Sequence, residues 1–210
     1  LGEDGWSELA QAKKLDSRSV LVQALLALYW RRNGEPERAF VALFDASKIE
    51  PDNGIWLLEM GLTKAEMGNI VSALKYLQQS VDIEPENPYY WQILAQFCVI
   101  HNTEIRNFGL PAARQFLLLS PNDAEALDLL GWVFMALEDN ISAERFFMKA
   151  LVVEPMHAHT HLHLGQLYLF ENRYEEAYPH LSLAAQLVSG EDDINIQAKR
   201  LLSRYYGIQE

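Results

Sequence analysis

Proline recurs along this chain at an almost constant spacing, because Pro51, Pro85, Pro121 and Pro155 lie 34, 36 and 34 residues apart. Within the units, a small residue is followed after twelve positions by Ala, after seven more by a small residue, and after five more by Pro. The series are Ala27, Ala39, Ala46, Pro51; Gly61, Ala73, Ser80, Pro85; Gly131, Ala143, Ala150, Pro155; and Gly165, Ala177, Ala184, with Ser189 in the proline position. A constant period of this length predicts a stack of similar supersecondary units.

The spacing indicates that each unit is a helical hairpin. Small residues are needed where two helices cross closely, and a proline just past a helix end stops that helix. Apolar side chains precede the small residues at helical intervals, as Leu57 and Met60 do before Gly61. Gly and Asn mark the chain reversals, for example at Asn33-Gly34. We therefore predict an all-α fold of stacked antiparallel hairpins.

The period of 34 residues, the small-residue spacing and the segment Trp91-Gln92-Ile93-Leu94-Ala95 resemble the tetratricopeptide repeat (TPR) family. The resemblance covers about residues 1–189. It implies a right-handed superhelix of stacked antiparallel helical hairpins, a TPR-like α-solenoid that ends in a C-terminal capping helix. TPR arrays serve as interaction scaffolds for unrelated partners, so the resemblance implies protein binding without naming the partner.

We predict a single TPR-like repeat domain over residues 1–210. Its parts are the second helix of a partial repeat (1–17), full repeats at 20–53, 54–87, 88–123, 124–157 and 158–190, and a capping helix (191–206). We expect eleven helices in all, and the lone first helix predicts that the chain begins inside a larger array or protein. The third repeat is two residues longer and carries Gly109 where Ala is expected, which predicts an irregular turn near His101 to Phe108.

Charge and composition exclude several classes of protein. The chain has 17 basic and 29 acidic residues and a net charge of −12, which opposes binding to nucleic acid. Cys98 is the single cysteine, so an intrachain disulfide or a Cys-rich zinc site is excluded. The longest apolar run, residues 19–30, falls short of the ~18 residues that span a bilayer. No secretory signal is visible, which leaves the compartment unknown, with the cytoplasm as the default.

The sequence shows no catalytic constellation, and we expect neither enzymatic activity nor a cofactor. Five of the six histidines lie between His157 and His180. His159 and His163 are four positions apart and share a helix face, which makes them a weak candidate pair for a metal ion. No cysteine completes a ligand set, so we expect no metal, with His161 in the core and the other histidines as partly exposed polar residues.

The first helices of stacked hairpins line the concave face of such an array. One stripe on these helices has twenty positions, of which thirteen are apolar and three are charged. Packing accounts for about half of this apolar character, and the remainder predicts an exposed groove that holds a partner. The predicted partner-binding residues are Leu21, Leu28, Ile55, Leu58, Leu62, Tyr89, Gln92, Gln96, Asp128, Trp132, His159 and Gln166.

We interpret the chain as a non-catalytic scaffold that binds a peptide or helix of a partner protein in this groove. The alternative is a structural or assembly module of a larger envelope- or secretion-associated protein, or self-association through the same groove. TPR domains that clamp acidic chaperone C-termini use Lys, Asn and Arg on their first helices. Arg31 is the only cation of this stripe, so we do not predict a chaperone C-terminus as the partner. Trp132 is either a principal anchor for the partner or a core residue, and the sequence favours both equally.

Overall fold

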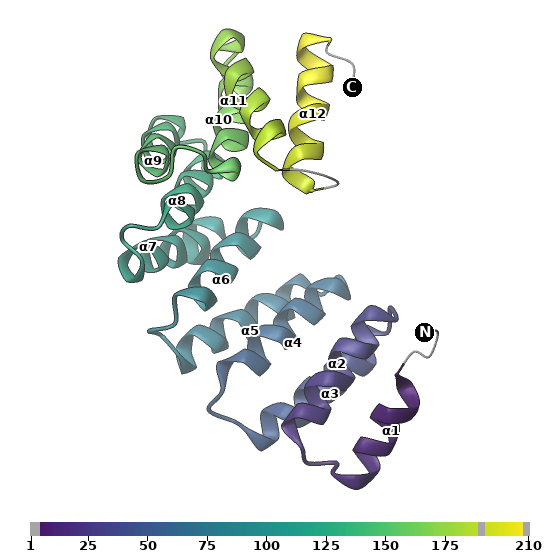
Figure 1. Cartoon of the computed structure of the whole chain (residues 1–210). Coiled ribbons are helices and arrows are strands. Elements are labelled where there is room, and N and C mark those ends of the chain that lie inside the picture. The colour runs from purple at the N-terminus through teal and green to yellow at the C-terminus, as the bar shows by residue number, and fades with distance from the viewer. Residues whose placement is uncertain (1–4, 189–191, 208–210) are drawn as a thin grey trace. The chain divides into compact units, whose positions relative to one another are not determined.

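The computed structural model describes residues 5–188 and 192–207, which form helices joined by turns, with no strand among them. In chain order the helices are α1 (Trp6–Leu15), α2 (Val20–Arg32), α3 (Pro36–Ile49), α4 (Gly54–Glu66), α5 (Ile70–Ile83), α6 (Pro88–Ile100), the π-helical turn η1 (Ile105–Gly109), α7 (Leu110–Leu119), α8 (Ala124–Ala136), α9 (Asn140–Val153), α10 (Ala158–Phe170), α11 (Tyr174–Leu187) and α12 (Asp193–Tyr206) (Figure 1). The predicted all-α class is confirmed. The expected number of eleven helices is wrong, because five pairs and two end helices make twelve α-helices in the described residues. None of the helices described is long and apolar enough to cross a membrane.

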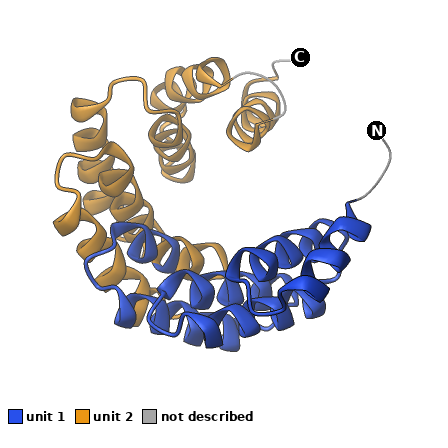
Figure 2. Ribbon diagram, turned by 60° about the horizontal axis from the view of Figure 1, so that its bottom comes forward, with its two compact units in different colours: residues 1–94 blue, residues 95–210 orange. Residues whose placement is uncertain are grey.

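Consecutive helices pack as hairpin pairs within two compact units, residues 1–94 and 95–210 (Figure 2). In the first unit α2 packs against α3 and α4 against α5, and in the second unit α8 packs against α9 and α10 against α11. Each pair joins two helices through a short turn, so the two helices run antiparallel. The bounds of the five repeats, and their grouping into one domain, remain a proposal.

Glycine lies where the paired helices approach most closely. A Cβ atom at Gly131 in α8 would lie 2.6 Å from the ring of Phe147 in α9. A Cβ atom at Gly165 in α10 would likewise lie 2.5 Å from Cδ2 of Leu181 in α11. Real Cβ atoms do not approach other carbons this closely, so the spacing of small residues in the sequence reflects these crossings.

The third hairpin has the predicted irregular turn. After α6 ends, Asn102 and Glu104 adopt left-handed backbone conformations, with φ of 45° and 47°, and η1 then leads into α7. Gly109 is required here because a Cβ atom at this position would lie 2.9 Å from the Cβ of Cys98. Burial raises the pKa of the Cys98 thiol to about 12, so this cysteine is a buried apolar residue rather than a nucleophile.

The last helix, α12, covers the end of the second unit. It packs against α11 and α10, and its Ala198 and Leu202 are buried in the same core cluster as Leu181. The side chain of Asp192 accepts a hydrogen bond from the N–H of Ile194 and caps the helix start. Ser189, in the fifth proline position, and residue 191, where the predicted cap begins, lie outside the described residues.

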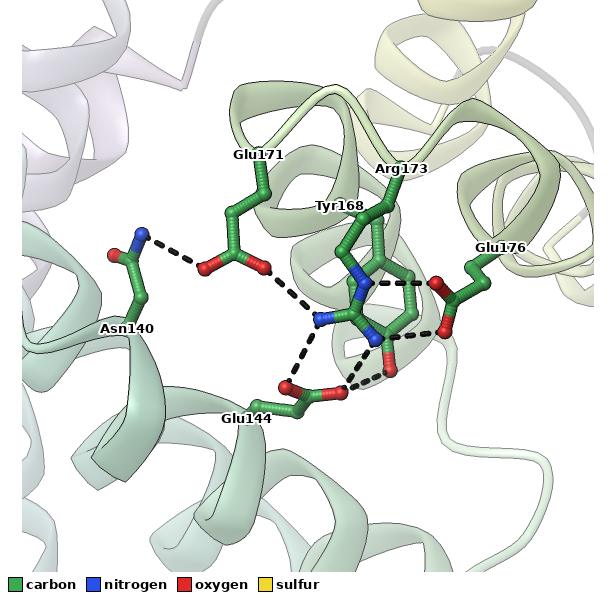
Figure 3. Close-up of polar contacts among 6 residues, drawn as sticks. All are labelled: Asn140, Glu144, Tyr168, Glu171, Arg173 and Glu176. Carbon is green, nitrogen blue, oxygen red and sulfur yellow. Dashed lines mark hydrogen bonds and ion pairs between the residues drawn. The ribbon is translucent and has the colours of Figure 1, made fainter.

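A cluster of charged side chains ties α9 to the turn between α10 and α11 (Figure 3). The guanidinium of Arg173 donates to both carboxylate oxygens of Glu144 at 3.0 and 3.1 Å, to Glu176 at 2.6 and 2.8 Å and to Glu171 at 2.9 Å. The hydroxyl of Tyr168 donates to Glu144 at 2.8 Å, and the guanidinium lies 4.1 Å from the Tyr168 ring centroid. Because its partners lie on consecutive hairpins, Arg173 links their packing.

Candidate functional site

A pocket of about 540 Å³ opens within the unit of residues 95–210. Four helices line it: the end of α6, the first helices α8 and α10 of two consecutive hairpins, and α12. The lining residues are Gln96, Ile100, Glu125, Asp128, Leu129, Trp132, His159, Leu162, His163, Gln166, Asp193, Ile194 and Gln197. The pocket lining therefore combines apolar side chains with amide and carboxylate groups, a composition typical of binding sites.

Trp132 is half-buried at this pocket and stacks on His163. The ring centroids lie 5.0 Å apart with an interplanar angle of 20°. His163 also stacks on Phe147 at 5.6 Å, so the imidazole connects Trp132 to the core between α8 and α9. Trp132 thus both packs against the core cluster and lines the pocket.

Asp128 and His163 form a buried polar pair beneath the pocket. The Nδ1 atom of His163 lies 3.0 and 3.1 Å from the carboxylate oxygens of Asp128, and Thr160 also donates to this carboxylate. Burial opposes the charge of Asp128, but the interactions with His163 and Thr160 outweigh it and hold the pKa of the Asp128 carboxyl below its usual value. Because Asp128 is an anion, its interaction orients the His163 ring with Nδ1–H toward the carboxylate.

Glu125 lies next to two further histidines, His157 and His159, of which His159 also lines the pocket. Its Oε2 atom lies 3.3 Å from Nε2 of His157 and 3.6 Å from Nδ1 of His159. Gln96 donates to the other oxygen, Oε1, at 3.3 Å. Desolvation lowers the pKa of the His157 imidazole. Glu125, together with the nearby Asp128 and Glu154, raises it by a larger amount, so the net pKa is higher than usual.

Comparisons with known proteins agree with this architecture. The family model of the tetratricopeptide repeat matches residues 31–97. Over these residues the chain carries tetratricopeptide repeats. No curated protein sequence matches it.

Solved structures of TPR proteins share the fold at low sequence identity. MamA (residues 41 to the end) from Desulfovibrio magneticus RS-1 superposes with a TM-score of 0.66 at 20% identity, over 80% of this chain and 94% of that chain. TTC0263 from Thermus thermophilus gives 0.69 at 19% identity over 88% and 99%, respectively. YrrB, described as a TPR protein with an unusual peptide-binding site, gives 0.60 at 18% identity over 91% and 97%. TPR folds are in general non-catalytic scaffolds for protein–protein interaction.

Part of the predicted groove of the TPR array lies together in the second unit. Five predicted residues line the pocket, namely Gln96, Asp128, Trp132, His159 and Gln166. Asp128 lies at its base with 2% exposure, because it bonds to His163 on the next first helix. The candidate metal pair, His159 and His163, also lines the pocket, but His163 bonds to Asp128 while His159 faces Glu125.

The other predicted residues lie in the first unit of the TPR array. Leu21 and Leu28 on α2 are exposed, at 68% and 60%, and Tyr89 on α6 is exposed as well. Ile55, Leu62 and Gln92 are half-buried. Leu58 has no exposed surface, because α4 packs against both α3 and α5, and it therefore leaves the set of residues that could contact a partner. Arg31, the cation of the stripe, pairs with Glu59 at 2.7 Å and with Glu66.

Sequence reasoning missed the pocket residues that come from α12. Asp193, Ile194 and Gln197 line the pocket, although their amphipathic pattern predicts only a cap. It also missed Thr160, a fully buried hydroxyl that touches both Asp128 and His157. No local pattern marks either contribution, since both depend on how separate helices meet.

Proposed function

We propose that this TPR protein is a non-catalytic scaffold that binds a segment of a partner protein in the pocket between α8, α10 and α12. The observation that carries the proposal is Trp132, a half-buried aromatic side chain at a pocket of about 540 Å³. Aromatic side chains supply much of the binding energy at the centres of protein interfaces. YrrB, with a similar fold, is described as having a peptide-binding site, which is compatible with this role.

The lining of the pocket favours a particular kind of segment. Leu129, Leu162 and Ile194 provide apolar surface beside Trp132, and the amides of Gln96, Gln166 and Gln197 can bond to a peptide backbone. Glu125 and Asp193 add carboxylates, and the described residues that line the pocket include no Lys or Arg. We infer a segment with one apolar or aromatic anchor next to Lys or Arg. The net charge of −12 on this chain also attracts a basic segment.

A peptide library displayed on phage tests the proposal. Peptides selected on the wild-type protein should carry an apolar residue beside Lys or Arg. Their affinity, measured by fluorescence anisotropy, should fall by ~2 kcal/mol or more, about 30-fold, in Trp132→Ala. Phe170→Ala is the matched control, because Phe170 is an exposed aromatic on α10 that does not line the pocket. Selected peptides that bind Trp132→Ala at full strength would place recognition elsewhere.

Self-association is a second candidate, and the exposed leucines of α2 favour it. Leu21, Leu25 and Leu28 are 68%, 42% and 60% exposed and lie on one helix of the first unit. Contiguous apolar surface of this kind marks interaction sites. Light scattering should then show an oligomer for the wild-type protein and a monomer for the double variant Leu21→Glu, Leu28→Glu. A monomeric wild-type protein would exclude self-association and leave partner binding as the remaining candidate function.

A further inference from the structure

Three potential metal ligands converge where α8 and α10 begin. They come from Glu125, His157 and His159, each of which offers one ligand atom, and these atoms lie within 4.8 Å of one another. Glu125 Oε2 is 3.3 Å from Nε2 of His157 and 3.6 Å from Nδ1 of His159. Two imidazoles and one carboxylate are the ligand set of many three-residue zinc sites.

A hydrogen-bonded neighbour orients one of these ligands. Nδ1 of His157 lies 2.8 Å from Oγ1 of Thr160, and the hydroxyl of Thr160 donates its proton to Asp128. The Thr160 oxygen then accepts from Nδ1–H of His157. Nε2 of a protonated His157 donates to the Glu125 carboxylate, and a metal ion bound at Nε2 would displace that proton. Metal-binding histidines in proteins are typically oriented in this way, by a hydrogen bond from the other ring nitrogen to a neighbouring acceptor.

We propose that Glu125, His157 and His159 bind one divalent transition-metal ion of the zinc class. This inference goes beyond the proposed function. Zinc–nitrogen and zinc–oxygen bonds of ~2.0–2.2 Å in a tetrahedron place neighbouring ligand atoms about 3.3–3.5 Å apart. Two of the three ligand distances already lie close to that range, and His159, whose side chain is half exposed, has room to rotate and shorten the third.

The donor types set the choice of ion. Imidazole nitrogen favours Zn²⁺, Co²⁺, Ni²⁺ and Cu²⁺, whereas Mg²⁺ and Ca²⁺ require mostly oxygen ligands. Three protein ligands leave a fourth position, and Glu125 and His159 both line the pocket.

His163 stays outside this ligand set. Its Nδ1 atom is committed to Asp128, and its ring is stacked between Trp132 and Phe147. A separate pair, His161 and His180, has its Nδ1 atoms 2.8 Å apart, but no carboxylate ligand joins it within the described residues. These two histidines provide the controls.

Calorimetric titration of the chelator-treated chain with ZnCl₂ tests the site. The wild-type protein should bind one Zn²⁺ per chain, and His159→Ala, His157→Gln and Glu125→Gln should each weaken binding at least about tenfold, since even the loss of a group that only orients a ligand costs about 10–100-fold. His180→Asn should leave the affinity unchanged. Co²⁺ in place of Zn²⁺ should give the absorption bands of a four-coordinate site.

His159→Ala decides the test, because this exposed side chain can be removed without disturbing the fold, as unchanged thermal melting in the absence of metal would show. The proposal is overturned if the wild-type protein shows no saturable binding, or if His159→Ala binds Zn²⁺ as tightly as the wild type. It is also overturned if His157→Gln retains full affinity, which would assign binding to His159 and His163. Loss of binding in His180→Asn would assign it to the other histidine pair.

Discussion

Nδ1 of His163 lies 3.0 Å from Oδ2 of Asp128, and both side chains are almost completely buried. The two residues belong to α10 and α8, the first helices of consecutive hairpins, so the bond joins neighbouring repeats. Thr160 adds a second donor to the same carboxylate. A buried anion that is this well paired is tolerated, but it becomes costly once its partners are disturbed.

Replacing Asp128 with Asn should therefore destabilise the second unit. The substitution removes the charge that His163 and Thr160 stabilise and leaves buried polar groups poorly paired, so we expect a loss of about 3 kcal/mol in the free energy of unfolding. Urea denaturation measures the loss. Asp52→Asn, at an exposed position, should change stability by less than about 0.5 kcal/mol. An equal effect of the two variants would contradict the buried pair.

Gly131→Leu should destabilise the protein by about 1–3 kcal/mol, because the added side chain meets the Phe147 ring at the crossing of α8 and α9. Ala136→Leu, at an exposed position of the same helix, is the control for added volume and should stay within about 0.5 kcal/mol of the wild type. Thermal melting compares the two variants. An unaltered melting temperature for Gly131→Leu would show a looser crossing than the structure has.

His180 should contribute a loss of stability to the second unit as the solution becomes mildly acidic, opposite in sign to the contribution of His157, whose pKa is raised. Nε2–H of His161 donates to the carbonyl of Pro155, so its Nδ1 accepts from Nδ1–H of a neutral His180. Desolvation, then the neighbouring His161, lower the pKa of His180 below its usual value of 6.5, although Glu176 opposes this. The unfolded chain takes up the proton first, so stability is complete above about pH 6.5 and is lost as the pH falls toward the folded pKa.

His180→Asn separates this effect from other titrations. The Asn amide places a donor near the position of Nδ1 but does not titrate. Between pH 7.5 and pH 5.5, the melting temperature of His180→Asn should fall less, or rise more, than that of the wild-type protein. Equal changes in both proteins would remove His180 as a source of the pH dependence.

Arg173→Lys should cost about 1 kcal/mol, because an ammonium cannot reproduce the paired bonds that the guanidinium makes with Glu144 and Glu176 (Figure 3). Part of this loss should disappear in 0.5 M NaCl, since the side chains of the cluster are partly exposed. Arg38→Lys is the control, because Arg38 forms a more exposed pair with Glu35 and should lose less than about 0.5 kcal/mol. Urea denaturation of both variants at low and high salt provides the comparison.

The fold class could be predicted from the sequence because its determinants are local and periodic. Helix length, turn residues and close crossings each place a characteristic residue at a set position, as Gly131 and Ala143 do in α8 and α9. The irregular third turn was visible as well, since Gly109 interrupts the spacing. Repeat register even places Glu125 and His159 at equivalent positions, 34 residues apart, and the structure brings their side chains together.

The tertiary structure decided which residues of the stripe are exposed. Leu58 and Asp128 share the groove pattern with Leu28 and Trp132, yet both are buried, because exposure depends on how neighbouring helices cover each position. His157 joins Glu125 only because the start of α10 lies near that of α8, and α12 adds Asp193 and Ile194 to the pocket. Periodicity assigns a residue to a helix face, whereas the contacts between separate helices determine what that face meets.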